Sequence, residues 1–295
     1  ACVPFGIVQL SPDTDTIPHN VDGVYQGKAY EYCAGYQYHD KTIVGFSHTH
    51  MSGTGHSDLG DILIMPTTGP LKLNPGTSDN PDSGYRSRFT HDTEKAAPGY
   101  YEVKLDDYGV KVQLTATQRV GVHKYTFPVD KEGRIVLDLN HSIYNYEGKT
   151  LWATLRVEND TLLTGYRITN GWARTNYTYF AISLSQPIKN YGYKDHQRIL
   201  YNGWWRKFPI NNNFPEMAGR KLVSYFEFDT SRNPELVVKV ALSATSTEGA
   251  LKNLQAEAVS KSFEMIASEA SDNWKRQLAS IEIQGTKDQQ VMFYT

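Results

Sequence analysis

Cysteine is scarce in this sequence, which holds only Cys2 and Cys33 among its 295 residues. A dense disulfide framework of the kind that stabilises small secreted domains is therefore excluded. One disulfide formed in an oxidising compartment and two free thiols both remain open, and we favour free thiols. Long apolar runs are missing too. None approaches the roughly 20 residues that a membrane helix needs, so we expect no membrane span.

The sequence also lacks a large excess of positive or negative charge. The formal net charge is -2 and charged residues make up 21% of the chain. No strong field therefore attracts nucleic acid or an anionic membrane, and we expect no nucleic-acid partner. A signal peptide is absent, and the first residue is not methionine. We expect that an upstream segment has been removed.

Tyrosine and glycine, in contrast, are plentiful, with 20 Tyr and 23 Gly. Tyrosine favours strands and glycine favours turns, so the composition is typical of a large β domain. Flat tyrosine rings also stack on the faces of sugars. The composition therefore suits carbohydrate binding, although packing within sheets accounts for the same rings.

Apolar and polar residues alternate with a period of two over much of the chain, and turn signals separate the runs. A helical period of useful length is not found before residue 246. Many short strands joined by tight turns predict a mainly β protein with a large antiparallel sandwich. The strands that we expect cover residues 101–105, 110–115, 119–127, 134–139, 150–158, 161–170, 175–184, 223–228 and 236–244.

The pattern becomes helical after the last of these strands. Ser246 is followed by Thr247 and Glu248, which is typical of a helix start. A second helix carries an apolar stripe, and a third begins near Lys287 and is still apolar at residues 291–295. We expect this last helix to continue into further chain. The predicted domains are a sandwich (1–245), a helical linker (246–284) and the start of a further domain (285–295).

One loop concentrates the polar chemistry of the chain. It lies between two strand-like runs, 42–46 and 61–65, and glycines there allow unusual backbone conformations. Loops held by a rigid scaffold often carry function. The polar and glycine residues of this loop are Ser47, His48, His50, Ser52, Gly53, Thr54, Gly55, His56, Asp58, Gly60 and Asp61.

Several roles are open for this loop. On a strand, His48 and His50 would point to the same face, and a third ligand from His56 or Asp58 would complete a zinc-like or iron-like set. Alternatively, the histidines line a pocket for a polar ligand or satisfy nearby backbone groups. Asp58 and Asp61 flank a glycine, and we interpret them as residues that pin the loop. We find no serine-nucleophile elbow and no phosphate-binding loop.

Several long segments resemble a known family. The chain resembles the N-terminal domain of glycoside hydrolase family 92, which comprises calcium-dependent, exo-acting α-mannosidases. The segments that carry the resemblance are PFGIVQLSPDT at 4–14, GYQYHDKTIVGFSHTHMSGTGHSDLGDILIMP at 35–66, EKAAPGYYEVKLDDYGVKVQLTATQRVGVHKYTFP at 94–128, TGYRITNGWA at 164–173 and QQVMFYT at 289–295.

The resemblance implies a galactose-mutarotase-like sandwich, then linker helices, then an (α/α)6 catalytic barrel of which only the start falls within this chain. The family's glutamate acid, aspartate base and most ligands of its Ca2+ ion belong to that barrel. We therefore expect no catalytic residue and no metal ligand here. By resemblance, the complete protein hydrolyses α-mannosidic bonds of mannose-containing glycans with inversion, together with its C-terminal catalytic domain, in the periplasm or outside a bacterial cell.

The resemblance also implies that the sandwich contributes one wall of the mannose pocket. The alternatives are that the loop only seals the domain interface, or that the chain is a non-catalytic carbohydrate-binding or structural module. The residues that we expect to shape the sugar site are Tyr32, Cys33, Gly35, Tyr36, His48, His50, Ser52, Gly53, Thr54, Gly55, His56 and Asp58.

Overall fold

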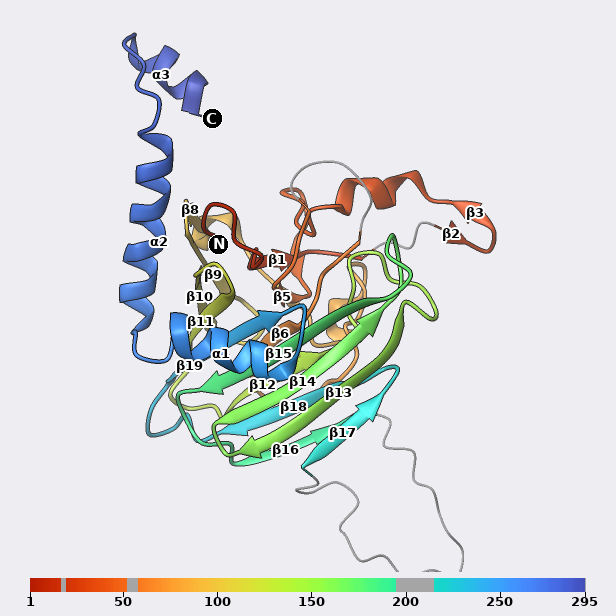
Figure 1. Ribbon diagram of the computed structural model, residues 1–295. Helices are drawn as coiled ribbons and strands as arrows, with labels where there is room; N and C mark the ends of the chain where they lie inside the picture. The colour runs from red at the N-terminus through yellow and green to blue at the C-terminus, as the bar shows by residue number, and fades with distance from the viewer. Residues whose placement is uncertain (17–19, 52–57, 195–214, 295) are drawn as a thin grey trace, which may run out of the picture.

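Two antiparallel sheets stack face to face in the computed structural model, which describes residues 1–16, 20–51, 58–194 and 215–294 (Figure 1). The six-stranded sheet has the order β1 (Ser11–Asp13), β5 (Gly45–Ser47), β6 (Leu63–Thr67), β12 (Gly133–Asp138), β18 (Val223–Phe228) and β16 (Asn190–Tyr193). The nine-stranded sheet has the order β17 (Glu216–Gly219), β13 (Thr150–Asn159), β14 (Leu162–Thr169), β15 (Asn176–Leu184), β19 (Glu235–Ser243), β11 (Val120–Thr126), β10 (Val110–Ala116), β9 (Tyr100–Leu105) and β8 (Lys95–Ala97).

Smaller elements surround the sandwich. A hairpin of β2 (Asn20–Val21) and β3 (Val24–Tyr25) projects from it, and β4 (Thr42–Ile43) pairs with β7 (Ser87–Arg88). The short 3-10 helices are η1 (Gly27–Tyr32), η2 (Pro81–Ser83) and η3 (His91–Thr93), and the α-helices are α1 (Thr247–Glu257), α2 (Phe263–Leu278) and α3 (Lys287–Tyr294). Among the described residues, none of the helices has the length and apolar character that crossing a membrane demands.

The strands follow the period-two pattern that predicted them. In the hairpin of β9 and β10, Val103 pairs with Val112 and both are fully buried, whereas Lys104 and Lys111 pair on the exposed side. The predicted mainly β sandwich followed by helices is thus confirmed. The pairing of distant strands, such as β11 with β19, comes from the tertiary structure.

The main core lies between the two sheets. Burying one aliphatic or aromatic side chain there contributes about 1.5–3 kcal/mol, and dozens of such side chains offset the entropy lost by ordering the strands. Buried core residues of the six-stranded sheet include Phe46, Ile64, Ile135, Leu137 and Phe226, and those of the nine-stranded sheet include Val103, Val112, Leu114, Phe180 and Val238.

A second apolar layer covers part of the outer face of the nine-stranded sheet. Helix α1 lies across this face (Figure 1). Ala250 and Leu254 of the helix pack with Ala181 and Ala241 of the sheet, whose small side chains let the helix approach closely. Ser246 caps α1 by accepting a hydrogen bond from the backbone N–H of Gly249 at 3.0 Å, as its sequence predicted.

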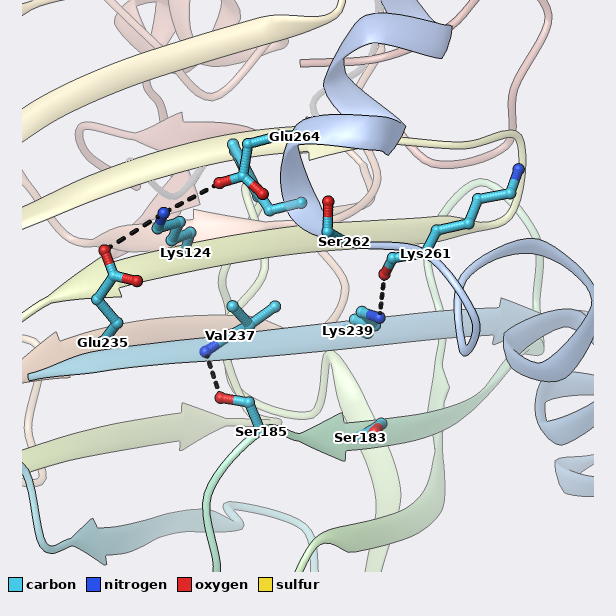
Figure 2. Close-up of a pocket in the computed structure, with 10 residues that line it drawn as sticks. Lys124, Ser183, Ser185, Glu235, Val237, Lys239, Lys261, Ser262 and Glu264 are labelled. Atoms are coloured by element: carbon cyan, nitrogen blue, oxygen red, sulfur yellow. Dashed lines mark hydrogen bonds and ion pairs between the residues drawn. The ribbon is translucent and has the colours of Figure 1, made fainter. Parts of the chain in front are cut away.

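Lysine side chains fix the turn between α1 and α2 on the sheet (Figure 2). The ammonium of Lys239 donates to the carbonyls of Ala258 and Lys261, both at 2.7 Å, and so satisfies carbonyls at both ends of this turn. Lys124 lies 3.3 Å from Glu235 and 3.0 Å from Glu264 at the start of α2. The hollow of about 270 Å³ beside these groups is therefore lined by charges that already have partners.

Candidate functional site

The polar loop of the sequence extends the hairpin formed by β5 and β6. Phe46 pairs with Ile64, and the backbone N–H of His48 donates to the carbonyl of Asp61 at 2.9 Å. Leu59 and Ile62 have φ angles of 73° and 57°, in the left-handed region that side chains rarely adopt. Such strained residues cluster at functional sites, because the surrounding structure must hold them in place.

His48 is fully buried and belongs to a chain of hydrogen bonds that joins the two sheets. Its Nδ1 lies 2.6 Å from the carbonyl of Ile62, which only accepts, so Nδ1 carries the proton. Its Nε2 therefore accepts from Nε2 of His123 at 2.9 Å, and Nδ1 of His123 accepts from the hydroxyl of Tyr125 at 2.7 Å. Burial lowers the pKa of His48 to about 4 and that of His123 well below its usual value, so both rings are neutral.

His50 is buried and faces two acceptors. Its Nδ1 lies 2.5 Å from the carbonyl of Gln9 and its Nε2 lies 2.7 Å from Oδ1 of Asp13. A ring that donates from both nitrogens carries a positive charge. His141 reaches the other oxygen of Asp13 at 2.7 Å. Burial alone would raise the pKa of Asp13, but the charge and hydrogen bonds of the two histidines outweigh it and hold that pKa well below its usual range.

Gly35 lies directly against this buried pair. Its φ angle is 80°, which glycine adopts without strain. A Cβ atom at this position would lie 2.2 Å from Oδ1 of Asp13 and 2.9 Å from Cδ2 of His50. The backbone conformation and the close approach therefore both require glycine at residue 35.

Arg167 ties the strained end of the loop to the opposite sheet. The side chain is 1% exposed, and its Nε lies 3.3 Å from Oδ1 of Asp61. It also donates at 2.6 Å to the carbonyl of His141 and at 2.6 Å to Oγ of Ser142. Thr49 donates its hydroxyl to Oδ2 of Asp61 at 2.8 Å. The arginine thus orders three segments that are distant in the sequence.

Asp58 connects the loop to two other segments of the chain. Its carboxylate accepts from the buried ammonium of Lys149 and, at 3.0 Å, from the backbone N–H of Trp172. Burial acts to raise the pKa of Asp58, but the lysine outweighs this effect and the pKa is lowered. The indole of Trp172 is 78% exposed beside this ion pair.

The predicted residues before the first strand of the loop lie on and after η1. The hydroxyl of Tyr32 donates to Asp40 at 2.8 Å, and that of Tyr36 donates to Glu94 at 3.1 Å. Burial raises the pKa of both tyrosines and the neighbouring carboxylates raise it further, so both remain protonated donors. Cys33 is buried and forms no disulfide with Cys2, as predicted.

A cavity of about 280 Å³ opens beside the loop. Of the predicted site residues, His50 lines it, whereas Ser52, Gly53, Thr54, Gly55 and His56 lie outside the described residues. Four parts of the chain surround the cavity: the N-terminal segment, the loop, the start of β15 and the end of β19. They contribute Ile7, Thr49, His50, Asp61, Tyr177 and Ser243, among others. Within the described residues, no group of three or more His, Cys, Asp or Glu side chains is placed to hold a metal ion.

Sequence reasoning missed the partners that hold the loop: Asp13, His141, Lys149 and Arg167. One signal was present, because the alternation of β14 places Arg167 on the same inward side as Leu163. An inward arginine in a strand must meet a buried acceptor. The carboxylates of Asp13, Asp58 and Asp61 are each engaged by a cation, so these groups build a rigid polar wall and do not form an acid–base pair.

Comparison with known proteins gives consistent matches. The model for the "Glycosyl hydrolase family 92 N-terminal domain" matches residues 1–243, and that for the "Glycosyl hydrolase family 92 catalytic domain" matches residues 249–295. The structure is similar to the family GH92 α-mannosidase BT3965 from Bacteroides thetaiotaomicron, with 36% identity, a TM-score of 0.86, and coverage of 99% of this chain and 37% of that chain.

Two more distant proteins share the fold or the sequence pattern. The family GH92 inverting mannosidase BT2199 from Bacteroides thetaiotaomicron matches with 24% identity and a TM-score of 0.71, over 97% of this chain and 34% of that chain. An uncharacterized secreted glycosidase of Arthroderma benhamiae is 24% identical over 96% of this chain and 36% of its own length. The chain thus spans little more than a third of these relatives.

Proposed function

The chain belongs to glycosyl hydrolase family 92, and on that premise we propose that the complete protein is an exo-acting α-mannosidase whose substrate pocket is shaped in part by this sandwich. The observation that carries the proposal is the 36% identity to a family GH92 α-mannosidase across 99% of the chain. The matches to the N-terminal and catalytic models follow each other without overlap, which supports a chain that leads from one domain into the next.

The roles that we propose for the sandwich and for the catalytic domain follow from the side chains of the loop. The sandwich (1–245) and the linker helices (246–284) present a polar wall, and the (α/α)6 domain that begins near residue 285 supplies the acid and the base. The reaction is hydrolysis of an α-mannosidic bond in a mannose-containing glycan, with inversion, in which a base activates water on the face opposite the leaving group. The paired state of Asp13, Asp58 and Asp61 supports the placement of both catalytic groups outside this chain.

Calcium is assigned to the catalytic domain in this proposal. Ca2+ takes six to eight oxygen ligands, mostly from carboxylates, carbonyls and water. The described residues do not fit such a site, because they offer no cluster of three acidic or other ligating side chains and the loop carboxylates are taken by Lys149, Arg167 and the histidines.

The predicted residues divide into two roles. We propose that Tyr36 and Asp58 contribute to the surface that faces the sugar, together with Trp172, whose backbone N–H contacts Asp58. His48 and His50 are 0% and 6% exposed with both ring nitrogens engaged, so they act by fixing the loop from behind. The complete protein is proposed to act in the periplasm or outside the cell, in line with the secreted glycosidase that it resembles.

Hydrolysis of p-nitrophenyl α-mannoside tests this proposal. The complete protein with calcium should release nitrophenol, and the chain of residues 1–295 alone should not. Proton NMR of the first product should show the β-anomer, because inversion turns an α bond into a β product. Absence of turnover by the complete protein on α-mannosides would refute the proposal, and an α-anomer as first product would refute inversion.

Alanine variants of the complete protein test the role of the loop. Tyr36→Ala and Asp58→Ala should raise KM, and Tyr32→Ala, His50→Ala and His56→Ala report on the other predicted positions. Tyr25→Ala, on the β2–β3 hairpin, serves as a matched control for loss of a surface ring. Unchanged kinetics in all five variants would mean that the loop only seals the domain interface.

A further inference from the structure

Four aromatic side chains gather on the outer face of the nine-stranded sheet, beyond the part that α1 covers: Trp152, Tyr166, Tyr177 and Tyr179, here called the ring patch. Residues Tyr177 and Tyr179 alternate along β15 with the same orientation as Ala181, which packs beneath α1. Figure 1 shows β13 and β14 running beyond the end of that helix. The ring patch is therefore on the solvent side of the sheet and not in the core.

Cross-strand pairing places these rings next to each other. In one row Trp152 pairs with Ile168, which pairs with Tyr177, and in the next row Tyr166 pairs with Tyr179. The ring centres of Tyr166 and Tyr179 are 5.6 Å apart, and those of Tyr177 and Tyr179 are 5.9 Å apart with planes only 11° from parallel. The strand register thus groups the three tyrosine rings, with Trp152 on the far side of Ile168 in the same row as Tyr177.

The ring patch is accessible and its polar groups have no partners among the described residues. Trp152 is 42% exposed and Tyr177 is 43% exposed. The indole N–H and the three phenol hydroxyls form no hydrogen bond within the part of the chain that the structure describes. Aromatic rings with a free polar end suit a ligand that is apolar on one face and hydroxylated at its edges, which is the chemistry of a pyranose ring.

The two strand rows of the ring patch carry no formal charge. The row through Tyr166 and Tyr179 continues to Thr154 and Ala218 on one side and to Ser243 on the other, and neither row contains an acidic or basic residue. Arg156 and Glu216, in the row through Thr164, form an ion pair with each other. A neutral, hydroxyl-bearing surface complements a neutral glycan better than it complements a nucleic acid or a charged peptide.

The ring patch is also continuous with the cavity beside the candidate site. Tyr177 and Ser243 line that cavity together with Thr49, His50 and Asp61 of the loop. We propose that the ring patch binds a segment of the mannose-containing glycan outside the pocket in which its terminal residue is cleaved. The identity of the sugar rests on the proposed function, whereas binding by the ring patch is tested separately.

Affinity electrophoresis of residues 1–295 in native gels that contain yeast mannan tests this proposal. The wild-type chain should be retarded in proportion to the mannan concentration. Tyr177→Ala/Tyr179→Ala should weaken the apparent affinity by roughly tenfold or more, since two stacking contacts are lost. Trp152→Ala gives a second, independent test if the double variant does not fold, as checked by thermal melting.

Tyr25→Ala is the matched control, because its ring is 64% exposed on a separate hairpin, and it should be retarded like the wild type. No retardation of the wild type, or equal retardation of the ring-patch variants, would overturn the proposal. So would a complete protein whose retardation does not depend on Tyr177 and Tyr179, because the catalytic domain would then cover the face. A complete protein that binds mannan through these residues but hydrolyses no α-mannoside would refute the proposed function alone.

Discussion

Replacing Gly35 by alanine tests the packing on which the site depends. Alanine in the left-handed region costs about 1–2 kcal/mol. The added Cβ would lie 2.2 Å from Oδ1 of Asp13, so the carboxylate must move away from His50. Breaking a buried ion pair costs about 3–5 kcal/mol when one partner is left unpaired. We therefore expect Gly35→Ala to lower the free energy of unfolding by about 4 kcal/mol or more.

Gly23→Ala is the matched control for this change. Gly23 has a φ angle of 82°, but a Cβ there would meet nothing within 4 Å, so it should cost only the backbone term of about 1–2 kcal/mol. Urea unfolding of both variants gives the two values. A second comparison in an Asp13→Ala background should remove most of the excess cost at Gly35. If Gly35→Ala were no more destabilising than Gly23→Ala, the close contact with Asp13 would be refuted.

Two further predictions concern the same buried network. Because the pKa of Asp13 is lowered in the folded state, its contribution to stability is present above about pH 4, the unfolded value, and is lost as the pH falls below it. The difference in unfolding free energy between the wild type and Asp13→Asn should thus be larger at pH 6 than at pH 3, and an equal difference would contradict the pairing. Arg167→Met should cost about 3–5 kcal/mol by leaving Asp61 buried without a cation. Arg156→Met, which breaks a largely exposed pair, should cost at most about 1 kcal/mol in the same urea titration. Equal losses in the two variants would argue against a buried ion pair between Arg167 and Asp61.

The sequence was sufficient for much of the fold. Alternation of apolar residues located strands such as β9, β10 and β14 to within one or two residues, because a half-buried strand must alternate. The capping serine and the acid after it located the start of α1. The order of the strands was not predictable in this way, since pairing between β11 and β19 joins segments more than 100 residues apart.

For the candidate site too, the sequence predicted the location but not the contacts. The concentration of histidines, glycines and acids between residues 47 and 61 identified the loop as a candidate site, because such a concentration is unusual in a loop that only connects two strands. Their roles could not be assigned, since a histidine that faces a ligand and one that supports a backbone carbonyl look alike in a sequence. The interior positions of His48 and His50 became apparent only when Ile62, His123 and Asp13 were placed beside them.

The sequence by itself determined that this chain is a large antiparallel β protein ending in helices, because local periodicity and capping depend only on neighbouring residues. The tertiary structure decided which groups meet. It alone brought Asp13 to His50 and His141, Arg167 to Asp61, and the rings of β13, β14 and β15 into one exposed surface. Hydrogen bonds and ion pairs act over a few ångströms in space, and the strand register sets that proximity regardless of distance along the chain.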